Sequence, residues 1–564
     1  MLPILLQPTS SFQNFNSNRP QLLPLMASTA ETGPWLLSLS LIAKCNYILS
    51  TNPYRLLLMT FILFTAIFLT ALLHWAHPGG PAWGRYISMC CLRCIIPGPK
   101  GFPFVGSMHL MTGLAHRKLF AASKAHEAKN LMAFSLGGTR AIVTANPNIS
   151  RDILTNPTFS SRPIKESAYG LLFDRAIGFA PDGVYWRLLR RISSFHLFSP
   201  KQIAISNLHR EHIAAEMTKA FCTAAALTDK IEARVFIKRA SLNNIMWSVF
   251  GKRYTLETEE PEMLELRSMV EEGYDLLGAL NWSDHLPFLS WFDLQGIRGR
   301  CERLVPRVNL FVSQIIAEHM SGNRPDEMRG SDFVDVLLSL QESEKLSNTD
   351  IVAVLWEMVF RGTDTVAVLI EWILARLVLH QDIQARVHEE LDRVVGLQQV
   401  MTESYSGSLT YLQAVIKEVL RMHPPGPLLS WARISTSDVY ISGKLIPAGT
   451  TAMVNMWAIT HDSDVWSDPL EFKPDRFFGS NAEELSIFGS DLRLAPFGSG
   501  RRGCPGKQLA MNTVTFWVAS LLHEFVWLLP SDQKTVDLSE VLRLSCEMAL
   551  PLKVQLKPRR KLSP

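Results

Sequence analysis

The stretch Phe497–Gly506 reads FGSGRRGCPG and places one cysteine, Cys504, in a glycine-rich loop. Glycines allow a backbone to approach a large flat group closely. Apolar residues recur at helical spacing from Leu509 to Leu521, so a helix is predicted to follow the loop. The N-terminus of a helix favours a thiolate, and its N–H groups tune whatever the sulfur binds. The loop therefore predicts a ligand cysteine, with a buried structural cysteine in a turn as the alternative.

Glu418 and Arg421 lie upstream of this loop and are three residues apart. On a helix this spacing puts them on one face, where they can pair. Alone, such a pair is an ordinary surface ion pair worth about 0–1 kcal/mol. A second arginine, Arg476, follows in FKPDRF at residues 472–477, before the cysteine loop.

Trp186 and Arg190 are four residues apart, so a helix would direct both side chains to one side. An indole N–H and a guanidinium together suit a carboxylate. Arg187 and Arg191 are expected to face solvent.

Residues 350–380 form an apolar run that predicts a helix of about 45 Å. Acids and arginines interrupt the run, so it is predicted to cross the core of a large globule rather than a membrane. Arg361-Gly362-Thr363-Asp364-Thr365 stands in its middle, and its polar groups favour local hydrogen bonds and a bulge. The alternative to a reactive site is a purely structural kink in the helix, in which these polar groups are all hydrogen-bonded.

These motifs, in this order, resemble those of the cytochrome P-450 superfamily of haem-thiolate monooxygenases. The resemblance covers about residues 97–557, and the pattern FxxGxRxCxG is matched at Phe497, Gly500, Arg502, Cys504 and Gly506. Residues 360–367 (FRGTDTVA) and 428–433 (LLSWAR) look like the plant microsomal type, and in particular the KLUH-like subfamily, which is linked to organ growth.

The resemblance implies a mainly α fold with small β-sheets and a role for each motif. Cys504 would be the axial iron ligand of haem b, whose thiolate favours O–O cleavage. Haem contacts would come from Trp186, Arg190, Arg433, Phe497, Arg502 and Gly506. Thr365 and Asp364 match an acid–alcohol pair that delivers protons during oxygen activation. Glu418, Arg421 and Arg476 match a buried structural cluster, from which loss of one member costs about 3–5 kcal/mol.

Two residues depart from the family pattern. Arg361 replaces a small residue before Gly362, and Val366 replaces a hydroxyl residue after Thr365. A guanidinium at residue 361 could meet a substrate carboxylate, but pairing with a structural acid is the favoured expectation.

The N-terminal region is predicted to form three segments before a catalytic domain at residues 109–564. Residues 1–33 read as a disordered leader. Residues 34–76 read as a membrane anchor, with an uncharged run at about 56–73 that can span a bilayer. Residues 77–108 form a proline-rich hinge. Cys90, Cys91 and Cys94 fall in this hinge and read as reduced thiols, because no matching ligand pair for a metal is seen.

The amino-acid composition excludes some classes of function for this chain. Its 564 residues are 47% hydrophobic and carry a net charge of +4, which excludes a disordered chain and gives no basis for nucleic-acid binding. Eight cysteines are too few and scattered for a disulfide scaffold. We expect a single-pass protein of the endoplasmic reticulum membrane with a cytosolic catalytic domain; a plastid is the alternative, from the acid-poor leader.

The expected reaction is insertion of one oxygen atom from O2 into a hydrophobic small molecule, with a fatty acid as one candidate. Electrons would come from NADPH through NADPH–cytochrome P-450 reductase. A haem-thiolate isomerase or dehydratase and a haem-binding sensor without turnover are the alternatives. The presence of Asp364 and Thr365 favours the monooxygenase, because an isomerase needs no oxygen-activating pair.

Overall fold

The computed structural model describes residues 53–84, 95–256, 260–321, 332–340, 344–429, 432–479 and 485–559. The predicted leader, the first part of the anchor, the three hinge cysteines and residues 430–431 lie outside these ranges. Contacts within the chain divide it between Leu69 and Thr70, inside the helix α2 (Pro53–Ala76), into two units that are described separately.

The N-terminal apolar helix is somewhat longer than the sequence predicts. Tyr54–Ala76 has a mean hydropathy of 2.6, and this helix is long and apolar enough to cross a membrane. Large apolar side chains such as Leu57, Phe61 and Phe64 are exposed along it. Burial in a protein core, the usual alternative for such a run, therefore does not account for this helix.

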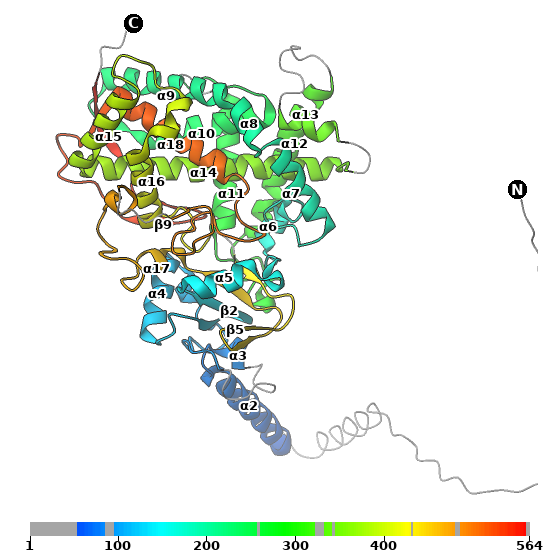
Figure 1. Cartoon of the computed structure of the whole chain (residues 1–564). Coiled ribbons are helices and arrows are strands. Elements are labelled where there is room, and N and C mark those ends of the chain that lie inside the picture. The colour runs from blue at the N-terminus through cyan, green and yellow to red at the C-terminus, as the bar shows by residue number, and fades with distance from the viewer. Residues whose placement is uncertain are drawn as a thin grey trace, which may run out of the picture. The chain divides into compact units, whose positions relative to one another are not determined.

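The body of the protein, from residue 70 onward, is mostly helical (Figure 1). Its α-helices are α3 (Pro81–Gly84), α4 (Ala115–Ala125), α5 (Pro147–Thr155), α6 (Glu166–Gly170), α7 (Val184–His196), α8 (Pro200–Ile205), α9 (Asn207–Leu227), α10 (Ala233–Phe250), α11 (Pro261–Gly278), α12 (Ile297–Met320), α13 (Phe333–Leu338), α14 (Asn348–Leu379), α15 (Gln381–Val394), α16 (Thr410–Met422), α17 (Met456–Thr460) and α18 (Lys507–Glu524).

The helix α14 runs through the middle of the helical part (Figure 1). Its 32 residues correspond to about 48 Å. A capping box starts it, because the Ser347 side chain accepts from the Asp350 N–H while the Asp350 carboxylate accepts from the Ser347 N–H. Trp356 and Trp372 on α14 are buried in two different apolar clusters. The predicted core-crossing helix is confirmed.

The bulge predicted inside this helix is absent, because α14 is continuous from residue 348 to residue 379. The expected local hydrogen bond is present: Thr363 Oγ1 donates to the Val359 carbonyl at 2.7 Å. This bond occupies the hydroxyl without displacing the helical backbone. Gly362 lets α10 approach, since a Cβ there would lie 2.3 Å from Ile245 Cδ1.

Four small sheets complete the described body. The strands are β1 (Met132–Leu136), β2 (Thr139–Thr144), β3 (Ile231–Glu232), β4 (Arg433–Ile434), β5 (Val439–Ile441), β6 (Lys444–Ile446), β7 (Thr451–Val454), β8 (Phe525–Leu528), β9 (Glu540–Leu542), β10 (Cys546–Met548) and β11 (Lys553–Pro558). The largest sheet has the order β1-β2-β7-β4; the others pair β3-β11-β8, β5-β6 and β9-β10.

The register of the largest sheet places one predicted site residue. β7 pairs parallel to β2 and antiparallel to β4, so Arg433 stands opposite Ala452. Residues 77–84 also pack on this sheet, because Trp83 is buried and donates from Nε1 to the Phe134 carbonyl at 3.0 Å. The described beginning of the predicted hinge thus belongs to the packed body.

Candidate active site

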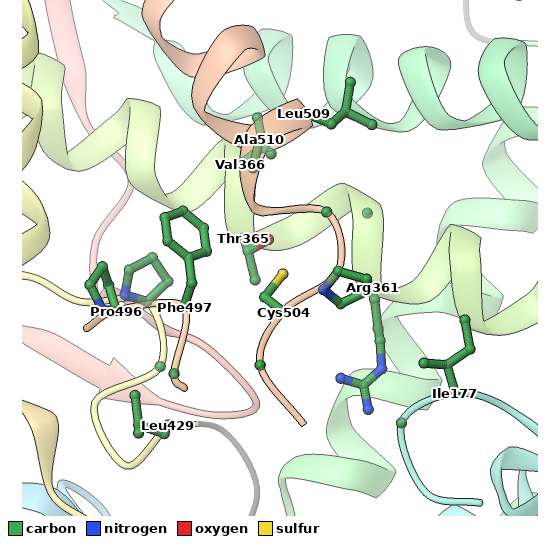
Figure 2. Close-up of a pocket in the computed structure, with 18 of the residues that line it drawn as sticks. Ile177, Arg361, Thr365, Val366, Leu429, Pro496, Phe497, Cys504, Leu509 and Ala510 are labelled. Carbon is green, nitrogen blue, oxygen red and sulfur yellow. The ribbon is translucent and has the colours of Figure 1, made fainter. Parts of the chain in front are cut away.

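A cavity of about 290 Å³ in the body is lined by residues of α14 and of the loop before α18. Figure 2 shows Thr365 of α14 and Cys504 of the loop at this cavity, with Phe497 on one side and Arg361 on the other. Most of the predicted site residues line it: Trp186, Arg190, Thr365, Arg433, Phe497, Arg502, Cys504 and Gly506. Asp364, Glu418, Arg421 and Arg476 do not.

Cys504 is held by the backbone of its own loop. Its N–H donates to the Phe497 carbonyl at 3.0 Å. Gly500 has a positive φ of 68°, and a Cβ there would lie 2.0 Å from the Leu154 carbonyl oxygen, so only glycine fits. The helix α18 begins at Lys507, as the sequence predicts.

The Cys504 side chain has accessible surface, but this surface faces the cavity, deep within the protein. Burial therefore raises the pKa of the thiol above its ordinary value. A hydrogen bond from the Gly506 backbone and the charges of Arg361 and Arg190 act in the opposite direction. The Gly506 N–H and the nearby cations would thus stabilise the thiolate form of Cys504 when its sulfur ligates a metal.

Four arginines line the cavity beside Arg361: Arg162, Arg190, Arg433 and Arg502. Backbone carbonyls fix their directions: Gly178 and Ala432 for Arg162, Gly503 for Arg190, Ser499 for Arg433, and Ser160, Ile177 and Ala180 for Arg502. The guanidinium of Arg502 also lies 4.0 Å from the centre of the Trp186 ring. Arg162 is a site residue that the sequence analysis missed.

These arginines lower one another's pKa values. Burial, together with the charges of Arg502 and Arg190, lowers the pKa of Arg433 to about 9. Burial lowers the pKa of Arg502 to about 10, with Asp182 opposing the shift. The pKa of Arg162 is also lowered, by burial and by the charges of Arg433, Arg502 and Arg361. Buried cations in this situation stabilise an anionic group placed among them.

Trp186 and Arg190 lie on one side of α7, as predicted. Trp186 is buried, and its Nε1–H donates to the Ile177 carbonyl at 2.9 Å. The indole N–H therefore has a backbone acceptor in this structure. The side chains of Arg187 and Arg191 are about two-thirds exposed, which agrees with their predicted solvent-facing direction.

Thr365 and Asp364 face different sides of α14. Thr365 exposes its side chain to the cavity that contains Cys504. Asp364 is buried against α10, where its carboxylate pairs with Lys238 Nζ at 3.2 Å. Burial alone would lower the pKa of Lys238, but Asp364 and Glu547 outweigh it and raise this pKa. The predicted pair is thus divided between two environments.

Arg361 lines the cavity and pairs with an acid one helical turn earlier. Its Nε donates to Glu357 Oε1 at 2.8 Å, and Glu357 is fully buried. The Gly178 N–H also donates to both oxygens of Glu357, at 2.8 and 3.1 Å. The favoured expectation, pairing with a structural acid, agrees with this geometry.

Glu418, Arg421 and Arg476 form a buried cluster away from the cavity. Arg421 donates to both Glu418 oxygens at 2.8 Å, and Arg476 Nε donates to Oε1 at 3.1 Å. Arg421 also donates to three backbone carbonyls, of Thr460, Pro469 and Glu471. These bonds tie α16 to the segment that leads to the cysteine loop.

Comparison with known proteins agrees with this geometry. The family model described as Cytochrome P450 matches residues 96–551 of the chain. This chain belongs to the cytochrome P450 family. Cytochrome P450 78A9 of Arabidopsis thaliana is 59% identical over 541 residues, covering 95% of this chain and all of the relative. Cytochrome P450 78A3 of Glycine max is 55% identical with the same coverage.

The predicted KLUH-like subfamily is confirmed by these 78A relatives. A more distant relative, flavonoid 3'-monooxygenase of Arabidopsis thaliana, is 36% identical over 82% of this chain and 91% of its own length. The chain is therefore a cytochrome P450 monooxygenase of mainly helical fold. The residues of the cavity suit a haem. The Cys504 thiol can ligate an iron, and the buried arginines can pair with the two propionate carboxylates of a haem.

Proposed function

We propose that this cytochrome P450 inserts one oxygen atom from O2 into a hydrophobic small molecule, with Cys504 as the axial ligand of haem b. The observation that carries the proposal is the position of Cys504 and Thr365 on the wall of one cavity that buried arginines also line. When bound, a haem iron with a thiolate ligand supplies O–O cleavage and oxygen transfer.

Each group of residues then has a task in the proposed reaction. Arg190, Arg433 and Arg502, with Arg162, would hold the two haem propionates, and Trp186 packs against Arg502. Phe497 and Gly506 line the cavity beside Cys504. Glu418, Arg421 and Arg476 would hold the segment that delivers the loop.

Proton transfer is proposed to use Thr365 and Asp364 in different ways. The Thr365 side chain lines the cavity, where its hydroxyl would donate to the reacting oxygen and accept a proton in return. Asp364 is adjacent in the chain but pairs with Lys238, so it would supply protons through water and after release from that pair.

The setting of the reaction is part of the same proposal. The apolar helix Tyr54–Ala76 would anchor the protein in the endoplasmic reticulum membrane, with the catalytic domain in the cytosol. Electrons would arrive from NADPH through a cytochrome P-450 reductase. A fatty acid is a candidate substrate, and a role in plant growth control follows from the KLUH-like resemblance.

An isotope experiment tests the proposal. The full-length protein would be placed in vesicles with a plant reductase and NADPH, and fatty acids and terpenoids would be screened first by absorbance change. The bound compounds are then turned over under O2 labelled with heavy oxygen. One labelled atom per product molecule is expected. Unlabelled, isomeric products formed without NADPH would instead support an isomerase and contradict the proposal.

A further inference from the structure

His116, Glu540 and Cys546 meet inside the body, and none of them lines the cavity that contains Cys504. They come from α4, β9 and β10, and their ligating atoms all lie within 4.8 Å of one another. Cys546 stands opposite Leu542, and Glu540 is two residues before Leu542 on the same strand. Glu540 and Cys546 therefore lie on one face of the hairpin.

The ring of His116 is the clearest sign that this group can take up a ligand. The side chain is fully buried, yet neither Nδ1 nor Nε2 makes a hydrogen bond with the described residues. Nε2 lies 3.5 Å from Glu540 Oε2, which is longer than an ordinary hydrogen bond. Buried polar atoms of this kind are rare, because leaving them unbonded is costly. A metal ion beside the carboxylate would use this ring nitrogen.

The two oxygens of Glu540 have different neighbours. Oε1 lies 3.3 Å from His423 Nδ1, and Arg376 contacts His423 Nε2 at 2.7 Å. Since an arginine can only donate, His423 carries its proton on Nδ1 and donates it to Glu540. Oε1 thus orients the carboxylate, while Oε2 is the oxygen beside His116. Hydrogen bonds of this kind fix the ligands of metal sites.

Cys546 is held by backbone hydrogen bonds in both directions. Its N–H donates to the Pro425 carbonyl at 2.9 Å, and its carbonyl accepts from Trp372 Nε1 at 3.1 Å. The residue is buried and its thiol is free of any disulfide. The sulfur therefore has a fixed place beside the histidine and the carboxylate.

A histidine nitrogen, a carboxylate oxygen and a thiolate sulfur form a mixed set of ligands that suits Zn2+, whereas Ca2+ and Mg2+ prefer oxygen alone. We propose that His116, Glu540 and Cys546 bind one Zn2+, with water as the fourth ligand. The thiol proton leaves to solvent on binding, because the thiolate is the ligand. The carboxylate and the thiolate then balance the charge of the metal. This site does not depend on the proposed function.

Arg117 occupies part of this site in the structure. Its Nε and Nη2 donate to Glu540 Oε2 at 3.1 and 2.8 Å. The side chain is about half exposed, and its guanidinium also lies 5.0 Å from the centre of the Trp457 ring. Arg117 can therefore release the oxygen and remain on the ring. Because Zn2+ and Arg117 compete for one oxygen, loss of the arginine should strengthen zinc binding.

Zinc at this site would act on the active cavity through a short turn. β9 ends at Leu542 and β10 begins at Cys546, and Leu544 and Ser545 between them line the cavity. A metal that joins α4 to both strands would hold this turn in place. Zinc should therefore raise the thermal midpoint of the protein.

A second group of possible ligands, formed by His319, Asp332 and Asp335, provides the control. Both ring nitrogens of His319 already have neighbours that can bond them. Nδ1 lies 2.7 Å from the Ile315 carbonyl oxygen, and Nε2 lies 3.1 Å from Asp332 Oδ2. His319→Gln thus removes a buried histidine beside a carboxylate and should leave zinc binding unchanged.

The test uses the haem-loaded, full-length protein and zinc chloride. Cys90→Ser, Cys91→Ser and Cys94→Ser are present throughout, because these three thiols could themselves bind zinc. Affinity is measured by competition with a chelator, and the ligands are identified by X-ray absorption at the zinc edge. One zinc per chain is expected, with one sulfur at about 2.3 Å and nitrogen or oxygen ligands at about 2.0–2.2 Å.

Variants assign the zinc to these residues. Cys546→Ser and, separately, His116→Gln should each weaken binding by at least about 100-fold, since a lost ligand costs more than a residue that only orients one. His423→Gln should weaken it by about 10-fold. Arg117→Gln should strengthen it by about 2- to 5-fold, the value of an exposed ion pair. Normal haem content shows that each variant is folded.

Three results would overturn the inference: no binding at micromolar zinc, bound zinc without a sulfur ligand, or unchanged affinity in the haem-loaded Cys546→Ser protein. Loss of zinc in His319→Gln would also contradict it, because the metal would then belong to the second group. A thermal midpoint that zinc raises in the parent protein, but not in Cys546→Ser or His116→Gln, supports the inference.

Discussion

Thr365 allows the most specific prediction for a single residue, because its side chain lines the cavity and that of Asp364 does not. Thr365→Ala should leave haem uptake and carbon monoxide binding intact, since neither uses the hydroxyl. It should remove assistance to proton transfer, which is typically worth about 10²–10⁴-fold. NADPH consumption is then expected to stay within about severalfold while electrons appear in hydrogen peroxide instead of product. Product and peroxide per NADPH are the quantities to measure.

Thr363→Ala is the matched control for this experiment. Thr363 is buried, and its hydroxyl donates to the Val359 carbonyl within the helix. Its loss should cost some stability and leave the coupling of NADPH to product nearly unchanged. Equal coupling in the unchanged protein and in Thr365→Ala would contradict the proposed proton transfer.

At the residue level, the sequence predicted the candidate site residues that belong to a motif. It missed those that only the tertiary structure places at the cavity. Cys504, Trp186 and Arg190 could be placed from spacing within a loop or a helix turn. Arg162 could not, because a single arginine before a proline has no pattern, and its neighbours come from distant segments. Asp364 and Thr365 are adjacent in sequence, yet adjacent residues of a helix point about 100° apart.

At the scale of elements, the buried cluster around Glu418 joins α16 to the segment before the cysteine loop. Arg421→Ala should leave the fully buried Glu418 with only part of its charge compensation, from Arg476, and destabilise the protein by about 3–5 kcal/mol. We expect a lower urea midpoint and poor haem retention. Arg386→Ala is the control, because the Arg386–Asp475 pair is exposed and worth about 0–1 kcal/mol. Equal losses in both variants would contradict the structural role.

The long helix α14, the predominance of helices and several short strands followed from the sequence. The sequence also has short strand-like runs at residues 141–144, 439–441, 452–455 and 552–555. All four lie at strands of the structure, with ends that agree within three residues. The predicted bulge in α14 was wrong. The Thr363 hydroxyl donates to a carbonyl of the preceding turn, and a regular helix accommodates this hydrogen bond. The short strand β4, which places Arg433, has only two residues and gave no signal in the sequence.

At the scale of the whole molecule, the structure indicates where the apolar N-terminal helix can be removed. A chain that begins at His77 should be extracted largely without detergent and should still bind haem. A chain that begins at Ile96 loses Trp83, which is buried against β1, and loss of such a side chain costs about 3–5 kcal/mol. The longer chain should therefore have the higher thermal midpoint. Equal midpoints would show that residues 77–84 do not stabilise the body.

Acid should destabilise the folded protein, because burial lowers the pKa of several histidines from 6.5. The value is about 4 for His209, His285, His388 and His423 and about 3 for His461. Between these values and 6.5 the unfolded chain binds protons that the folded chain does not, so stability is full above 6.5 and falls as the pH decreases toward 4. The urea midpoint should drop clearly from about pH 7 to about pH 5. An unchanged midpoint would mean that these histidines titrate normally.

The ligation of haem by Cys504 is the central claim, and the absorbance spectrum of the reduced, carbon-monoxide-bound protein tests it most directly. Cys504→Ser should lose the thiolate signature of this spectrum, since serine cannot supply the sulfur. Cys546→Ser should keep it, because Cys546 is buried on β10 and does not line the cavity. A thiolate signature that survives in Cys504→Ser would contradict the account.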